Sequence, residues 1–199
     1  MSSRALDRTQ APSPGPVKPF DFPTVHRERL DGPDSPELLT ARHGDVPLVT
    51  VQVVTEGGAA AEPDPQAGIA RLTAHALEAG TDAHDEEALA WELESLGVEL
   101  ETAASWDAAS VAITVHRDRL APAMALLADV VRRPAFPRGP VERMRDEQLA
   151  DILQRKKEPR ALASDAAAHF IFDDGVPYAR PIRGADASVR KLGPDHLRA

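Results

Sequence analysis

The amino-acid sequence predicts a protein that combines β-strands with helices, and three observations indicate this class. Residues 48–55 are the clearest strand candidate, because they are rich in β-branched side chains. Residues 68–81 have the apolar spacing of a helix. Residues 98–103 and 109–116 alternate apolar and polar side chains on either side of a short turn, which is typical of an antiparallel pair.

The composition narrows the range of functions. The 199 residues carry a net charge of −9, so the basic surface typical of nucleic-acid binding is missing and nucleic acid is not expected as a partner. The absence of cysteine excludes disulfides and thiolate metal sites. No apolar run is long enough for a membrane span, and no apolar segment follows Met1, so no export signal is visible and the cytoplasm is the default compartment.

The first part of the chain is predicted to contain an arm and three strands. Residues 1–24 are rich in proline and are expected to form a flexible arm, whereas residues 25–199 form the lobe. Residues 25–30 are a weak strand candidate and residues 37–43 a better one, and the segment between them has turn chemistry. A glycine pair ends the third strand, which covers residues 48–55.

The helix predicted over residues 68–81 presents two stripes. Its apolar residues lie on one stripe, and Gly80 is the expected stop. Arg71, His75 and Glu78 are three and four residues apart, so they share a second stripe. The apolar stripe consists of Ile69, Leu72, Ala76 and Leu77.

The second half of the chain is predicted to be mainly helical. Residues 85–96, 120–131 and 140–157 have helical spacing; Gly97 caps the first of these helices, and Pro159 ends or breaks the third. A further helix, a proline-rich loop and two helix starts follow. The inner face of the third helix is assigned to Val141, Met144, Leu149, Ile152 and Leu153, and that of the next helix to Leu162, Ala166, Ala167 and Phe170.

The surroundings of the central helix resemble the zinc helix of the pitrilysin/insulinase family of metallopeptidases. The inverted motif of that family is His-x-x-Glu-His, usually after Gly-aliphatic-small and before Gly-Thr. In this chain Gly68-Ile69-Ala70 precedes the motif position, and Gly80-Thr81 follows it. The resemblance implies an α+β fold, with an antiparallel sheet and helices packed on one face. It corresponds to the N-terminal lobe of a mitochondrial-processing-peptidase-like metallohydrolase, truncated at its C-terminal end.

The resemblance also implies which residues stand at the family's functional positions. Arg71 takes the place of the first zinc-binding His, Ala74 that of the general base, and His75 that of the second His. The third ligand, a Glu in the family, corresponds to Asp151. Arginine is always cationic and cannot bind a metal, and alanine cannot accept a proton. We therefore expect no catalytic residue and no bound metal, although the family cofactor is zinc.

The residues left at this position allow several interpretations. Arg71 and Asp151 are candidates for an ion pair where zinc would lie. His75 alone is interpreted as a partly buried helix histidine without a metal, because it lacks the usual set of ligands. Glu78 is an alternative, displaced ligand. A degenerate metal site is the main hypothesis.

The function that the resemblance implies is that of a non-catalytic subunit, similar to the processing-peptidase-like subunits, which binds peptide or a partner in a peptidase complex. The expected partners are a catalytic family subunit or a second copy of the chain, and the expected ligand is a peptide. Strand addition to an exposed edge would survive the loss of zinc. The alternatives are an active zinc metalloendopeptidase with an altered site, and a purely structural subunit or degenerate fragment. The candidate peptide-binding edge is Ala103, Ala104, Ser105 and Trp106.

The C-terminal end gives a further expectation. Family lobes continue beyond the position that matches Ala199, and the last predicted helix has barely one turn. Short helices are marginal because nucleation is unfavourable. The stretch from Asp186 onward is therefore expected to be poorly packed, and the chain to self-associate or to need a partner.

Overall fold

A computed structural model describes residues 15–16, 19–32, 35–173 and 175–198. The chain divides into two units, Met1–Val46 and Pro47–Ala199, which are described separately. Most of the predicted arm, residues 1–24, lies outside the described residues. All candidate functional residues belong to the second unit.

The first unit contains the opening hairpin. Strand β1 (Val25–Arg29) pairs antiparallel with β2 (Glu37–Ala41), in a register that places Arg27 opposite Leu39. Both strands are exposed along their length, and an ion pair of 3.2 Å joins Arg27 to Glu37. The two predicted strands are confirmed, and the second ends at Ala41, earlier than the sequence indicated.

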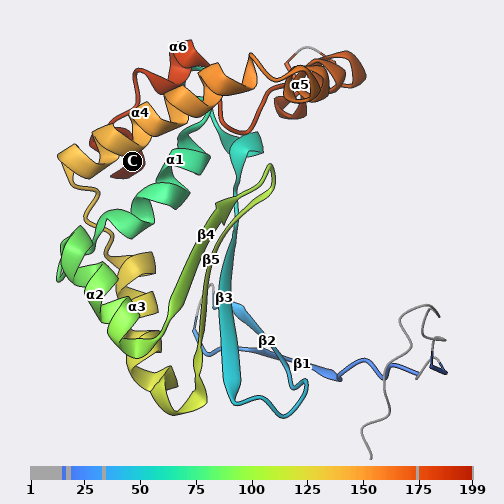
Figure 1. The fold of residues 1–199 in the computed structure, drawn as a ribbon, viewed down its shortest axis with the longest axis vertical. Helices are drawn as coiled ribbons and strands as arrows, with labels where there is room; N and C mark the ends of the chain where they lie inside the picture. The colour runs from blue at the N-terminus through green and yellow to red at the C-terminus, as the bar shows by residue number, and fades with distance from the viewer. Residues whose placement is uncertain (1–14, 17–18, 33–34, 174, 199) are drawn as a thin grey trace, which may run out of the picture. The chain divides into compact units, whose positions relative to one another are not determined.

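The second unit is built on a three-stranded antiparallel sheet. Strands β3 (Leu48–Glu56), β4 (Glu99–Ala104) and β5 (Ala108–His116) lie in the order β3-β5-β4, so β5 is central and β4 forms one edge (Figure 1). The register places Ile113 opposite Val51 on one side and Leu100 on the other. Because strand side chains alternate, Val111, Ile113 and Val115 all face the core.

Seven α-helices complete the described part of the second unit. Figure 1 shows α1, α2 and α3 gathered on one face of the sheet. Helix α4 packs against α1, on the side of α1 that faces away from the sheet. The predicted α+β class, with an antiparallel sheet and helices on one face, is confirmed. The helices are α1 (Ile69–Ala76), α2 (Glu86–Leu96), α3 (Leu120–Arg132), α4 (Arg138–Arg155), α5 (Pro159–Ile171), α6 (Asp186–Val189) and α7 (Pro194–Arg198).

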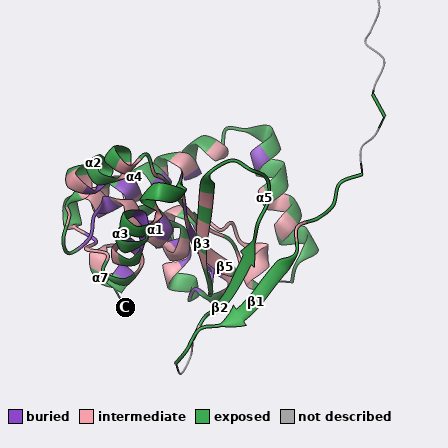
Figure 2. Cartoon of the chain, turned by 90° about the horizontal axis from the view of Figure 1, so that it is seen from below, coloured by how far each residue is buried: buried purple, intermediate pink, exposed green. Residues whose placement is uncertain are grey.

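Two apolar clusters hold these layers together, and the buried residues on the inner sides of the helices are visible in Figure 2. One cluster joins the sheet to α2 and α3 through residues such as Ile113, Leu89 and Leu127. The other joins α1 to α4 and the C-terminal helices, with Leu72 fully buried at its centre. Leu77, the residue directly after α1, packs against both clusters, so the end of this helix links the sheet to the second helical layer.

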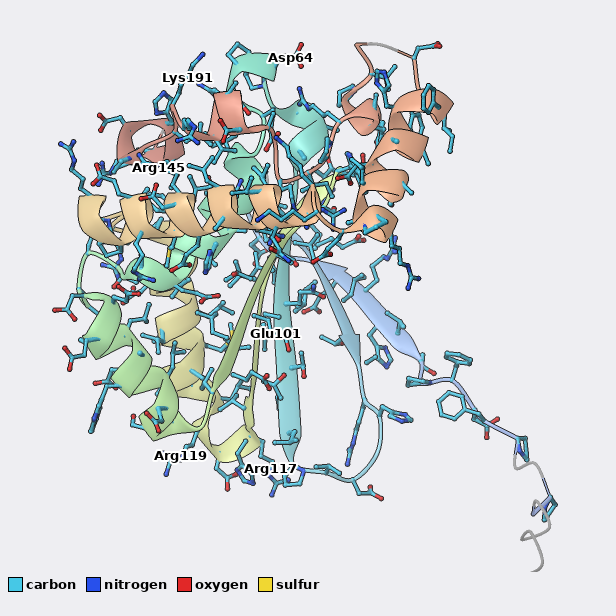
Figure 3. All side chains as sticks on the ribbon, turned by 45° about the horizontal axis from the view of Figure 1, so that its top comes forward. Asp64, Glu101, Arg117, Arg119, Arg145 and Lys191 are labelled. Atoms are coloured by element: carbon cyan, nitrogen blue, oxygen red, sulfur yellow. The ribbon has the colours of Figure 1, made fainter. Side chains whose placement is uncertain are left out.

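The expectation of a poorly packed C-terminal stretch is wrong. Val189, Leu192 and Leu197 are buried in the cluster that contains α1 and α4. Arg145 on α4, labelled in Figure 3, donates a hydrogen bond of 3.3 Å to the carbonyl of Leu192. The short helices are stabilised by burial of their apolar side chains, which a single-turn helix in isolation lacks.

Two predicted inner faces also need correction. Leu153 on α4 is 58% exposed, and on α5 Leu162 and Phe170 are 52% and 86% exposed, whereas Ala161 is buried. Pro159 is the first residue of α5 and separates this helix from α4. Proline is tolerated there because the N–H of the first helical turn has no partner within the helix. Helical spacing identified α5 correctly, but Leu162 and Phe170 are exposed and do not form its inner face.

Candidate degenerate metal site

The start of α1 is fixed by a buried carboxylate. Glu62, in the segment before the helix, accepts hydrogen bonds from the N–H groups of Gly68 at 2.9 Å and Ala70 at 2.7 Å. These donors have no partner within the first helical turn, so the carboxylate acts as a cap. Burial raises the pKa of the Glu62 carboxyl, although both N–H groups oppose this shift.

A loop from the C-terminal part of the chain is bound to the same point. Gln148 on α4 is buried and donates from Nε2 to the carbonyls of Gly68 at 3.0 Å and Arg183 at 2.9 Å. Ser188 donates to the carbonyl of Ala67 at 2.8 Å. Gly184 lies between these contacts with φ +73°, and a Cβ there would come within 2.1 Å of the Ala67 carbonyl oxygen. A glycine is therefore required for the loop to approach α1 closely.

This loop brings a cation to the predicted metal position. Asp151 Oδ2 lies 3.7 Å from Arg71 Nη2, so the structure contains the ion pair proposed from the sequence. The same oxygen accepts a hydrogen bond of 2.9 Å from Arg183 Nε. Arg183 follows Asp151 by 32 residues, and no motif in the sequence signalled its return. One carboxylate thus lies between two guanidinium groups, where a zinc site would need three neutral or anionic ligands.

The other predicted positions do not add metal ligands. Ala74 is buried on the side of α1 that faces the sheet. His75 is exposed, which corrects its interpretation as partly buried, and it lines a different hollow together with Glu78 and Arg143. Glu78 accepts a hydrogen bond of 3.0 Å from the hydroxyl of Thr102.

Within the described residues, no group of three or more His, Cys, Asp or Glu side chains is arranged to hold a metal ion. The residues that the resemblance assigns to the zinc position do not fit the family cofactor, because the carboxylate of Asp151 is paired with the guanidinium groups of Arg71 and Arg183.

The predicted peptide-binding edge adjoins this site. Ala104 and Trp106 line a cavity of about 220 Å³ together with Arg71 and Arg183. Sequence positions separated by more than a hundred residues thus meet around one hollow.

Part of that edge is already occupied by the chain itself. The main-chain carbonyl of Ser105 accepts a hydrogen bond of 2.9 Å from the N–H of Ala59, and the carbonyl of Trp106 accepts one of 2.8 Å from Ala60. The candidate edge is therefore reduced to the end of β4, at Ala103 and Ala104, whose strand pairs with β5 on one side only.

Comparison with known proteins identifies the family. The family model described as Insulinase (Peptidase family M16) matches residues 38–184, which is most of the chain. The chain therefore belongs to the insulinase family, peptidase family M16, and the resemblance inferred from the central helix is confirmed.

Three curated relatives have different names. Subunit 1 of the mitochondrial cytochrome b-c1 complex of Bos taurus is 27% identical over 77% of this chain and 32% of its own length. An uncharacterized zinc protease of Rickettsia bellii is 23% identical over 80% of this chain and 39% of its own length. The non-peptidase homolog YmxG of Helicobacter pylori is 23% identical over 77% of this chain and 35% of its own length. The chain spans about a third of the length of these relatives.

A solved structure supports the fold independently. The peptidase M16 inactive domain from Pseudomonas fluorescens superposes with a TM-score of 0.81 at 24% identity, over 88% of this chain and 42% of that one. In the described part of the present chain, no helix has the length and apolar character of a membrane span.

Proposed function

We propose that this chain is a non-catalytic member of its family that binds peptide, or a catalytic family subunit, within a peptidase complex. One observation carries the proposal: Asp151, which the resemblance assigns to the third zinc ligand, is held by Arg71 and Arg183. Arginine stays protonated and repels a metal cation. The names of two relatives, an inactive domain and a non-peptidase homolog, agree with this proposal.

Peptide binding would use the free edge of β4. A strand at the edge of a sheet presents unpaired N–H and C=O groups that an extended peptide can pair with, and this needs no metal. The edge ends at Ala104, beside the cavity that contains Arg71. Peptide docking by strand addition would not need the zinc ligands, which supports a non-catalytic peptide-binding role.

The alternative function is an active zinc metalloendopeptidase with an altered site, and the Rickettsia relative named as a zinc protease is the reason to test it. Purified protein is dialysed against trace zinc at neutral pH and its metal content is measured. We expect well under one zinc per chain. Stoichiometric zinc that is lost on His75→Ala would favour the altered active site and refute the non-catalytic proposal.

The assignment of the metal positions has its own test. The triple variant Arg71→His, Ala74→Glu and Asp151→Glu restores the family's ligand and base types, and Arg183→Ala is added because Arg183 would otherwise bind the carboxylate at position 151. We expect the quadruple variant to bind zinc more tightly than Arg183→Ala alone. A folded quadruple variant with no gain in zinc affinity would show that Asp151 is not the equivalent of the third ligand.

The partner is tested by mixing. Size-exclusion chromatography with light scattering measures self-association of the chain alone and complex formation with an intact His-x-x-Glu-His family member from the same source. A stable complex supports a partner subunit. A chain that binds neither such a subunit nor any extended peptide would leave the purely structural role as the better description.

A further inference from the structure

We propose that the cavity beside the predicted metal position is an anion-binding pocket that holds a carboxylate of the bound peptide. This inference rests on the proposed peptide-binding function and names the chemistry of the ligand.

The lining of the cavity is unusually rich in guanidinium groups. Its volume is about 220 Å³, well above the roughly 10–15 Å³ that a cavity needs to hold one water. One acidic residue, Asp165, lies among its described lining residues. The arginines are Arg71, Arg155, Arg180 and Arg183.

The acidic partners of these arginines leave donor capacity unused. Arg71 and Arg183 share the single carboxylate of Asp151, and Arg155 Nη2 donates to Asp165 at 2.9 Å. A guanidinium has five N–H donors in a fixed fork, so one shared carboxylate cannot use all of them.

Arg180 is held mainly by the main chain. Its Nη2 donates to the carbonyls of Ala59 at 2.9 Å and Glu62 at 2.7 Å, and lies 3.8 Å from Glu62 Oε2. Its Nη1 donates to Asp64, whose side chain is 91% exposed and which is labelled in Figure 3. These contacts fix Arg180 at the wall of the cavity.

Buried donors without acceptors give a second, independent indication. Within the described residues, three buried side-chain nitrogen atoms have no hydrogen-bond partner, and all three belong to residues that line this cavity. They are Arg155 Nε, Arg180 Nε and Trp106 Nε1. All are N–H donors without an acceptor in the protein, so the wall of the cavity carries a surplus of donors that favours an anion.

The position of the pocket favours a carboxylate on a peptide. Ala104, the last residue of β4, lines the cavity, so an extended peptide paired with this edge passes its mouth. Alternate side chains of an added strand point to the same face, and an Asp or Glu at one of these positions would enter the cavity. Arginine binds planar carboxylates with two parallel hydrogen bonds, which suits this partner.

The test compares three synthetic ten-residue peptides that differ only at the central position, which is Glu, Gln or phosphoserine. The sequence contains two tryptophans, and Trp91 on α2 is exposed, so Trp91→Phe leaves Trp106 as the reporter of binding. We expect the Glu peptide to bind at least about tenfold more tightly than the Gln peptide, as expected for a charged hydrogen bond. Equal affinity of these two peptides would overturn the pocket while leaving peptide binding intact.

Two variants connect the preference to the pocket. Arg155→Gln removes one wall cation, and we expect it to reduce the preference for Glu over Gln to less than about threefold. Arg143→Gln is the matched control, because Arg143 lies on the same helix but pairs with Glu86 and Glu147 and lines a different cavity. We expect Arg143→Gln to retain the preference. A folded Arg155→Gln protein with an unchanged preference would overturn the assignment. Trp106→Phe, measured by calorimetry, should weaken binding of the Glu peptide but not that of the Gln peptide.

Two further outcomes separate this inference from the proposed function. If no peptide binds, succinate replaces it as the probe, against sodium chloride at equal ionic strength. If succinate raises the melting temperature of the wild type but not that of Arg155→Gln, the pocket is supported although peptide binding fails. If succinate does not raise the melting temperature of the wild type, the pocket and the peptide-binding function are both overturned. Tighter binding of the phosphoserine peptide than of the Glu peptide would overturn the choice of a carboxylate and assign the pocket to phosphate.

Discussion

The close contact between Gly184 and the start of α1 gives the sharpest prediction, for the substitution Gly184→Ala. The left-handed φ of +73° costs an L-residue roughly 1–2 kcal/mol. The new Cβ would lie 2.1 Å from the Ala67 carbonyl oxygen, a main-chain atom, so the loop must move. That movement loosens the hydrogen bonds from Ser188 to Ala67 and from Gln148 to the Arg183 carbonyl, each worth about 1 kcal/mol.

Together these contributions predict that Gly184→Ala lowers the free energy of unfolding by about 3–4 kcal/mol. Gly97→Ala is the matched control, because Gly97 has φ +63° but no atom within 4 Å of an added Cβ. We expect this control to cost only the backbone contribution, about 1–2 kcal/mol. Equilibrium urea unfolding followed by circular dichroism measures both variants.

The difference between the two variants isolates the steric contact. If Gly184→Ala costs no more than Gly97→Ala, the loop does not approach α1 as closely as described. Because Arg183 precedes Gly184, the same movement should also weaken discrimination between the Glu and Gln peptides. Loss of stability without loss of that discrimination would separate Arg183 from the pocket.

Three other predictions concern the framework of the site. Glu62→Ala leaves two helix-terminal N–H groups unpaired and should cost about 2–4 kcal/mol, against under about 1 kcal/mol for the exposed Asp64→Ala, by urea unfolding. Burial raises the pKa of Glu62 in the folded protein, so the folded state binds the proton more tightly than the unfolded state. The free energy of unfolding of the wild type, relative to that of Glu62→Gln, should therefore fall as pH rises above the ordinary pKa of 4.5. An increase of that difference with pH would contradict the direction of the pKa shift. Leu72→Ala, at a fully buried position, should cost about 2–5 kcal/mol, whereas Leu153→Ala, at an exposed one, should be nearly neutral, and similar costs would refute the assigned core.

The sequence by itself determined the order and type of the elements. Alternation identified β4 and β5, helical spacing identified α1 to α5, and Gly97 ended α2 where it was expected to. The helix predicted up to Gly80 is instead α1, which ends at Ala76, followed by a 3₁₀ turn over Leu77–Ala79. These signals are local, because side-chain periodicity and glycine conformations depend on a few neighbouring residues. The sequence also predicted Arg71 at the first ligand position and Ala74 at the general-base position of the family motif, since a helix fixes the relation between such positions.

Only the tertiary structure decided which faces are covered and which distant residues meet. The exposure of Phe170, the exposure of His75 and the burial of Leu197 depend on which helix lies against which, and no local pattern contains that information. The return of Arg183 to Asp151 depends on a loop that a single glycine allows to pass close to α1. The arginine-lined pocket exists because long-range packing gathers residues from four separate stretches of the chain, from Arg71 to Arg183.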